Sequence, residues 1–341
     1  MGKEIIKNKT NDTIKLTNII QKFIEKKNKR NNERNNQKKN QKIELYKDKS
    51  IDFLKNYFNL NSQYHFYILN SCDASIFYAL NAILSNKEIK NINIPSTASW
   101  LSYEPFCELL NKINNNYKIN KYDFKNYEPN YEELKQENDN LNIIQLNPGY
   151  LNYVEIEKIP KNSIIDASGF KNKVNLNDFD CIVLSFQHWK PINIGFGGFI
   201  AIKKELDIKK KEKTYLKKIL DPQIKSLENS KISKKIINFN IYFYKKLYYN
   251  LNNLDERINK FQTFFDNKII SIMNFLKKEN INFEIKFFEN SLNALIITNL
   301  EKNQKDELII KLKQKFKEID FKNDLDIRFK GISVEIKRFF K

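Results

Sequence analysis

Between residues 64 and 202 the chain alternates short apolar runs with stretches of helical periodicity, and few folds accept this pattern. Helical stretches are predicted at 50–60, 71–84, 103–114 and 130–137. Strands are predicted at 64–69, 92–94, 117–123, 141–146, 164–166, 182–186 and 198–202. Short apolar strands separated by helices are typical of a mostly parallel sheet that is buried on both faces. The sequence therefore predicts an α/β protein with helices on both faces of a central sheet.

The 341 residues divide into three predicted regions. We expect a basic, flexible arm at 1–45 and a large α/β domain at 46–235. A long helix and a small α+β domain are expected at 236–341. The helical spacing of apolar residues over 236–278 indicates the long helix. The small domain is predicted to contain strands at 283–287, 294–297 and 327–336 and a helix at 305–319.

The composition bears on whether the chain has disulfides, a metal site or a membrane span, and on its cellular compartment. The three cysteines are scattered without a Cys-x-x-Cys pair, and there are only two histidines, which argues against a disulfide scaffold or a metal site. No run approaches about 18 consecutive apolar residues, and the N-terminus lacks the apolar core of a signal peptide. We therefore expect a cytoplasmic protein without a membrane span.

The net charge of +19 is concentrated near the N-terminus, where residues 1–50 contain 15 Lys and Arg against 6 Asp and Glu. Such a segment could bind nucleic acid by neutralising its phosphates. No RRM, KH, zinc-finger or basic-zipper pattern accompanies it. A solvated leader is the simpler interpretation, and we favour it.

Lys190 lies between an apolar run and a glycine cluster, which is not the usual sequence context of a surface lysine. Lys190 follows the apolar run 181–184 and precedes a cluster that holds three of the seven glycines of the chain, in Ser-Phe-Gln-His-Trp-Lys-Pro-Ile-Asn-Ile-Gly-Phe-Gly-Gly (185–198). A lysine with a lowered pKa is an amine nucleophile toward carbonyl groups, so the context suggests a Schiff-base residue. The alternative is a lysine that extends from a strand end into water.

The order of these features resembles the fold-type-I enzymes that depend on pyridoxal 5'-phosphate (PLP). Within them it is similar to the DegT/DnrJ/EryC1/StrS sugar aminotransferases. The resemblance covers about residues 50–202, and its specific part is Ser-Phe-x-x-x-Lys followed by Gly-x-Gly-Gly five residues after Lys190. It implies a fold-type-I PLP-dependent transferase with a small C-terminal α+β domain, PLP as the cofactor and a homodimer.

The resemblance also implies roles for individual residues. Lys190 would form the Schiff base with PLP, and Asp166, 24 residues earlier, would pair with the ring nitrogen and keep it protonated. Ser185 would hydrogen-bond the phosphate, Trp100 would stack on the ring, and Asn147 would reach the ring hydroxyl. Each has an ordinary alternative, because strand-end Asp, Ser and Asn often serve turns and tryptophan often serves the core.

The chain departs from the family pattern at several positions. The Ser-Gly-Thr of the phosphate-binding helix is Ser71-Cys72-Asp73 here. Backbone N–H groups at that helix start could still bind phosphate, but the Asp73 carboxylate repels a dianion unless it caps the helix. Gly169, Phe196 and Pro191 replace the Gln or His, the Glu and the Asn that are usual in the family.

Three functions remain open at this point. The first is a PLP-dependent aminotransferase that moves an amino group, commonly from glutamate, to a keto-sugar nucleotide through Lys190. The second is another fold-type-I enzyme acting on an amino acid, whose carboxylate Arg328 or Arg338 could bind. The third is a non-catalytic binding or scaffold protein, which the departures at Cys72, Asp73 and Gly169 and the basic arm suggest.

Overall fold

A computed structural model describes most of the chain. The described residues are 37–96, 102–114, 117–125, 128–134, 136–146, 154–170, 173–187, 190–207, 241–287, 293–323 and 331–335. Trp100, Asn147, Arg328 and Arg338 and most of the basic arm lie outside these ranges. Within them, no helix combines the length and the hydropathy needed to cross a bilayer.

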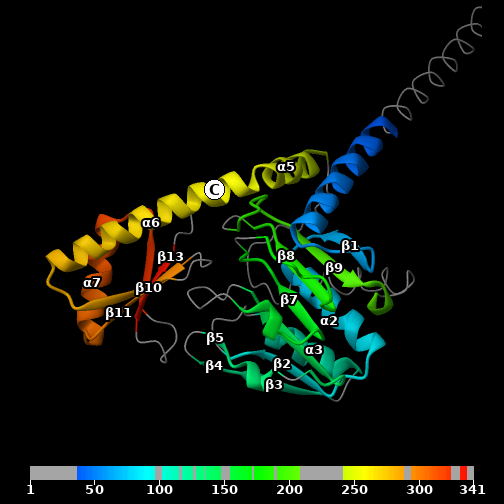
Figure 1. The fold of residues 1–341 in the computed structure, drawn as a ribbon, viewed down its shortest axis with the longest axis horizontal. Helices are drawn as coiled ribbons and strands as arrows, with labels where there is room; N and C mark the ends of the chain where they lie inside the picture. Colours follow the sequence, from blue (N-terminus) through cyan, green and yellow to red (C-terminus); the bar gives the residue numbers. More distant parts are fainter. Residues whose placement is uncertain are drawn as a thin grey trace, which may run out of the picture.

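A seven-stranded sheet forms the centre of the large domain (Figure 1). Its order is β1-β9-β8-β7-β6-β2-β3, and only β9 runs antiparallel to its neighbours. The strands are β1 (Tyr64–Leu69), β2 (Asn91–Pro95), β3 (Lys118–Tyr122), β6 (Asn140–Gln145), β7 (Ser163–Asp166), β8 (Cys181–Ser185) and β9 (Gly198–Lys203). The predicted mostly parallel α/β sheet is therefore confirmed.

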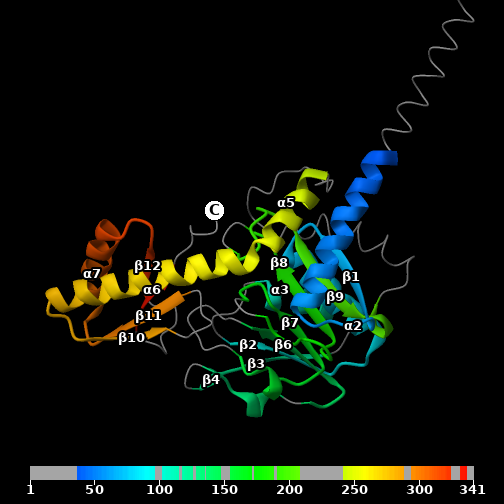
Figure 2. The ribbon, with the colours of Figure 1, turned by 45° about the horizontal axis from the view of Figure 1, so that its top comes forward.

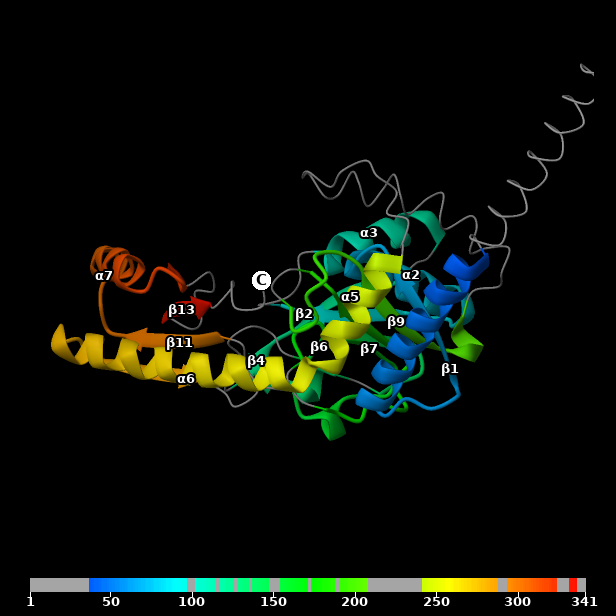
Figure 3. The same cartoon turned by 90° about the horizontal axis from the view of Figure 1, so that it is seen from above.

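The central strands are buried on both faces because alternate residues enter two different cores. In β8, Ile182 and Leu184 join one apolar cluster, while Cys181 and Val183 join the other. The helices α2 (Cys72–Asn86) and α3 (Tyr103–Asn114) cover the second face. The helix of residues 37–57 and α5 (Ile241–Asn252) cover the first face (Figures 2 and 3). The expected boundary at residue 45 falls inside the 37–57 helix.

A small C-terminal domain follows a long helix, α6 (Leu254–Lys278), which extends from the large domain to the small one (Figure 2). The sheet of this domain is antiparallel, in the order β10-β11-β13-β12. Its elements are β10 (Phe283–Phe287), β11 (Asn293–Thr298), α7 (Lys302–Lys315), β12 (Asp320–Asn323) and β13 (Gly331–Glu335). The sequence did not predict β12, because Asp-Phe-Lys-Asn carries a single apolar residue, Phe321.

Two expected helices differ from the structure. Among the described residues of the stretch 130–137, the one regular element is a 3-10 turn, Tyr131–Glu133, which follows the short strands β4 (Phe124–Lys125) and β5 (Glu128–Pro129). The Glu133 carboxylate accepts hydrogen bonds from the Asp123 N–H and the Asn130 amide, so it braces a loop instead of extending a helix. The expected single helix at 236–278 is divided into α5 and α6 at Asn253. Two further 3-10 turns are Ile156–Lys158 and Lys204–Leu206.

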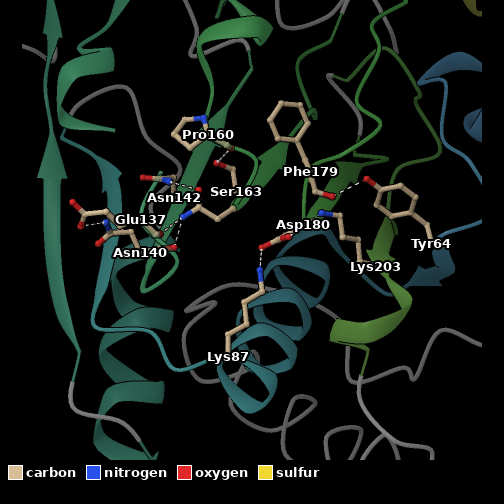
Figure 4. Close-up of polar contacts among 11 residues, drawn as sticks. Tyr64, Lys87, Glu137, Asn140, Asn142, Pro160, Ser163, Phe179, Asp180 and Lys203 are labelled. Atoms are coloured by element: carbon tan, nitrogen blue, oxygen red, sulfur yellow. Dashed lines mark hydrogen bonds and ion pairs between the residues drawn. The ribbon is translucent and has the colours of Figure 1, made fainter. Parts of the chain in front are cut away.

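Polar side chains tie together the edge of the sheet where the parallel strands begin (Figure 4). The buried Asp180 carboxylate, just before β8, accepts hydrogen bonds from Lys87 at 2.5 Å and Lys203 at 3.2 Å. The Tyr64 hydroxyl donates to the Phe179 carbonyl oxygen at 2.7 Å, and the Ser163 hydroxyl to the Pro160 carbonyl oxygen at 2.6 Å. Open α/β sheets bind their ligands at the opposite edge, where the parallel strands end.

Candidate active site

The ends of β6, β7 and β8 and the first turn of α2 meet at the carboxyl edge of the sheet. A pocket opens there that is lined by Cys72, Asp73, Gln145, Asp166, Ser168, Ser185, Gln187 and Lys190. Five residues that the sequence singled out, Lys190, Asp166, Ser185, Cys72 and Asp73, thus line one pocket. Ser71 lies beside it at the start of α2. Trp100 and Asn147 lie outside the described residues.

The Asp166 carboxylate is held from two sides at the end of β7. Its Oδ2 accepts a hydrogen bond from the Tyr103 hydroxyl at 2.6 Å, and its Oδ1 accepts one from the Ser168 N–H at 2.9 Å. Both side chains are buried, and Tyr103 is the first residue of α3. Burial, and then the Asp166 charge, raise the pKa of Tyr103 well above its usual value, so the phenol keeps its proton and donates.

The Cys72 thiol, at the start of α2, contacts the Ser168 side chain next to Asp166. Its Sγ lies 3.3 Å from the Ser168 Oγ, and Ser168 is buried as well. Burial, and then the charge of Asp166, raise the pKa of Cys72 well above the usual thiol value. The thiolate is the nucleophilic form of cysteine, so the raised pKa disfavours Cys72 as a nucleophile.

The first turn of α2 is capped within the chain. The Ser71 Oγ accepts a hydrogen bond from the Ala74 N–H at 3.0 Å, as an N-cap serine does. Gly198, at the start of β9, lies against this turn, and a Cβ there would come within 2.5 Å of the Ser71 carbonyl oxygen. Glycine at this position therefore lets β9 approach the helix start.

The loop after β8 carries Lys190 to the pocket and returns through the glycine cluster. The Phe186 carbonyl oxygen accepts the N–H of Gly195 at 2.9 Å, and the Phe186 N–H donates to the Gly197 carbonyl oxygen at 3.0 Å. Gly195 and Gly197 have φ angles of 101° and 99°, which side chains rarely permit. The two glycines therefore let the backbone turn back onto Phe186, and these hydrogen bonds fix the loop on which the half-buried Lys190 lies.

PLP fits the chemistry of this pocket at two of its ends. Lys190 supplies an amine, and the buried Asp166 supplies a carboxylate for a protonated ring nitrogen. The phosphate end fits less well. The lining residues include a second buried carboxylate, Asp73, and their one cation is Lys190, so little positive charge is available to balance a phosphate. The enclosed volume is about 30 Å³, which is room for about one water molecule, so PLP must displace lining side chains or occupy the open mouth.

Sequence reasoning missed four residues of the site: Tyr103, Gln145, Ser168 and Gln187. Gln145 ends β6, and Gln187 lies two residues after Ser185, so the strand-end criterion could have found both. The spacing Asp166-x-Ser168 matches an Asp side chain that binds the N–H two residues later. No local pattern indicates Tyr103, because its partner lies 63 residues away in the chain.

Comparisons with known proteins extend the description of the fold. No protein-family model matches the sequence, and no curated protein matches it. Solved structures do match it, and 839 chains do so significantly. A NifS-like protein matches with a TM-score of 0.59 and 12% identity, over 88% of this chain and 84% of that one.

Two further matches are enzymes of known name. A phosphoserine aminotransferase from Cytophaga hutchinsonii matches with a TM-score of 0.54 and 14% identity, over 88% and 84% of the two chains. Serine palmitoyltransferase from Sphingomonas wittichii matches with a TM-score of 0.54 and 12% identity, over 85% and 70%. Structures of SPT with PLP also match. At these identities the likeness concerns the fold, and the chain has the fold of the fold-type-I PLP-dependent transferases.

Proposed function

We propose that this protein is a PLP-dependent aminotransferase that carries PLP covalently on Lys190. The observation that supports this most is the meeting of Lys190 and Asp166 in one pocket at the carboxyl edge of the sheet. Several proteins that share the fold are aminotransferases, and others are structures of SPT with PLP. A fold hosts many functions, so the proposal depends on the site residues rather than on the fold.

Asp166 and Lys190 would have different roles in the proposed reaction. PLP, when bound, supplies an electron sink for carbanion chemistry. Asp166 would hold a proton on the ring nitrogen, because a buried carboxylate stabilises the positive charge beside it. The Lys190 amine would anchor the cofactor and, once displaced by an amino donor, carry the proton to and from the reacting carbon.

Two groups at the phosphate end of the site would then hold the cofactor. Ser185, which lines the pocket, would contact the phosphate, and its hydroxyl accepts the Gln187 N–H at 3.4 Å. The N–H groups at the start of α2 add the positive end of a helix dipole. These contacts would orient the cofactor so that the Lys190 amine meets its reactive carbon.

The substrates we propose are glutamate as the amino donor and a keto-sugar nucleotide as the acceptor. The segment 185–198 supports this choice, since it is similar to the DegT/DnrJ/EryC1/StrS sugar aminotransferases. Serine palmitoyltransferase among the structural matches keeps a second candidate, a fold-type-I transferase acting on an amino acid. A homodimer is proposed on the same family resemblance.

The first experiment asks whether Lys190 binds PLP. The purified full chain is mixed with PLP, treated with borohydride to fix any amine link, and digested for peptide mass analysis. We expect PLP on Lys190 and a visible absorption band that Lys190→Ala lacks. Lys161→Ala, which removes an exposed lysine before β7 at the other edge of the sheet, is the matched control and keeps the band.

The outcomes separate the candidate functions. A band that glutamate converts, and that a keto-sugar nucleotide restores, supports the aminotransferase. A response to other amino acids without amino transfer supports the second candidate. If neither the wild type nor Lys161→Ala binds PLP, the enzyme proposal is wrong, and a binding or scaffold protein becomes the better interpretation.

A further inference from the structure

We infer that Tyr103 is a positioning residue, which fixes the Asp166 carboxylate so that it keeps the ring nitrogen of bound PLP protonated. This inference rests on the proposed function. Its geometric basis is the 2.6 Å hydrogen bond from the Tyr103 hydroxyl to the Asp166 Oδ2. Tyr103 does not line the pocket, so it would act through Asp166 alone.

The contact has the features of a strong hydrogen bond. Tyr103 is 1% exposed and Asp166 is 4% exposed, so water screens neither group. A hydroxyl that donates to a carboxylate makes a charge-assisted bond, which is shorter and about twice as strong as a neutral one. In a buried site the electrostatic part of such a bond is strengthened further.

Several polar groups lie around the Asp166 carboxylate. They are the Tyr103 hydroxyl from α3, Cys72 and Asp73 from α2, and Lys190 and Ser168 from the loops after β8 and β7. Of these, the Tyr103 hydroxyl and the Ser168 N–H donate hydrogen bonds to the carboxylate. A hydrogen bond to the ionised form of a carboxylate favours that form, so the Tyr103 donor stabilises it.

The position of one proton then depends on Tyr103. The proton between Asp166 and the cofactor can lie on the ring nitrogen or on the carboxyl oxygen. Tyr103 stabilises the carboxylate and so moves the proton to the nitrogen. With Ser168 N–H on Oδ1, the carboxylate is also held in one orientation at the end of β7. Removal of the hydroxyl should therefore shift the proton toward Asp166 and weaken the electron sink.

The test compares Tyr103→Phe with Tyr122→Phe. Each change removes only a buried hydroxyl and keeps the ring, so the packing is conserved. Tyr122 is a matched control because it is equally buried and its hydroxyl donates to the Ile143 carbonyl oxygen at 3.1 Å, not to Asp166. The proteins are loaded with PLP labelled with ¹⁵N in the ring, and the nitrogen resonance reports whether the nitrogen is protonated.

We expect a protonated ring nitrogen in the wild type and in Tyr122→Phe. In Tyr103→Phe the resonance should move toward the neutral form, and turnover should fall about tenfold with little change in KM. Equal nitrogen resonances in all three proteins would overturn the role of Tyr103. A fall in turnover with an unmoved resonance would also overturn it, because that pattern indicates a general structural effect.

A second measurement uses the protein without cofactor. The side-chain carboxyl carbons of aspartate are labelled with ¹³C, and the Asp166 resonance is assigned with Asp166→Asn. Tyr103→Phe should move this resonance, and Tyr122→Phe should not. If the wild type binds no PLP, the proposed function fails and the cofactor part of the inference fails with it. The carbon resonance still decides separately whether Tyr103 holds the carboxylate.

Discussion

At the residue scale, Asp73 is the feature of the pocket that most opposes a phosphate. It is buried in the first turn of α2, where the helix dipole favours an anion, and its own carboxylate already supplies one. A phosphate near the same turn meets that charge at low dielectric, where repulsion is strong. We therefore expect Asp73 to lower the affinity of the proposed site for PLP.

Asp73→Asn should raise the affinity for PLP. The change removes one negative charge and keeps the shape, so we expect the dissociation constant to fall about tenfold, or about 1.4 kcal/mol. Absorbance titration with PLP measures it. Glu104→Gln is the control, since Glu104 also lies in a first helical turn but does not line the pocket, and it should have no effect. Unchanged or weaker binding in Asp73→Asn would show that the carboxylate turns away from the phosphate.

The sequence could indicate some site residues and not others for a physical reason. Asp166 and Ser185 end buried strands, and Lys190 follows one closely, so the strand-end criterion predicts where they lie. Tyr103 acquires its partner only when the start of α3 meets the end of β7 in the folded chain, and nothing near Tyr103 in the sequence encodes that meeting. The roles of all these residues stay predictions.

At the element scale, α6 belongs to two cores. Leu254 and Ile258 join the core of the large domain, whereas the buried residues from Phe261 onward join the core of the small one. The apolar spacing that predicted a long helix is therefore the spacing of one buried stripe. A helix break at Asn253 separates α6 from α5, and the buried apolar residues of α5 all join the core of the large domain.

Phe265→Ala should destabilise the small domain strongly. Phe265 is 1% exposed and contacts Phe261 with ring centroids 5.8 Å apart, so its removal leaves a cavity worth about 3–5 kcal/mol. Ile270→Ala, on the exposed side of the same helix, should cost less than about 0.5 kcal/mol. Urea unfolding of each variant measures the free energies. Similar losses for the two changes would mean that α6 does not pack as described.

Elements with a strong apolar period were predictable, and weak ones were not. The strand β1 and the helix α3 lie where the sequence placed them. The strand is a short, mostly aromatic and aliphatic run, and α3 places Tyr103, Phe106, Cys107 and Leu110 at helical spacing on one buried face. The 130–137 stretch misled because its glutamates serve as loop braces. The strand β12 was not predicted, because its hydrogen bonds to β13, and not an apolar pattern of its own, define it as a strand.

At the scale of the whole molecule, the sheet order depends on contacts between distant segments. The return strand β9 lies between β1 and β8, although about 130 residues separate it from β1 in the chain. The sequence predicts strands and a parallel majority, since both follow from local patterns. It does not predict that β9 is the antiparallel member, because the glycine loop after β8 reverses the chain through backbone hydrogen bonds on Phe186.

The burial of all three cysteines makes the stability of the whole molecule sensitive to alkaline pH. Burial raises the pKa of Cys107 from 9.0 to about 12, and the pKa values of Cys72 and Cys181 lie well above 9.0 for the same first cause. Below pH 9 the folded and unfolded chains hold these protons equally. Above pH 9 the unfolded chain releases them first, so the free energy of unfolding falls as the pH rises.

The expected slope gives this last prediction its test. Each retained proton contributes about 1.4 kcal/mol per pH unit, and for Cys107 the loss runs from pH 9 to about 12. Urea unfolding between pH 8 and 11 measures the slope. Cys107→Ala should make it shallower by about 1.4 kcal/mol per unit above pH 9, while leaving the slope below pH 9 unchanged. An identical slope in the variant would mean that the Cys107 thiol titrates in the folded chain, which its position against the α2–α3 core opposes.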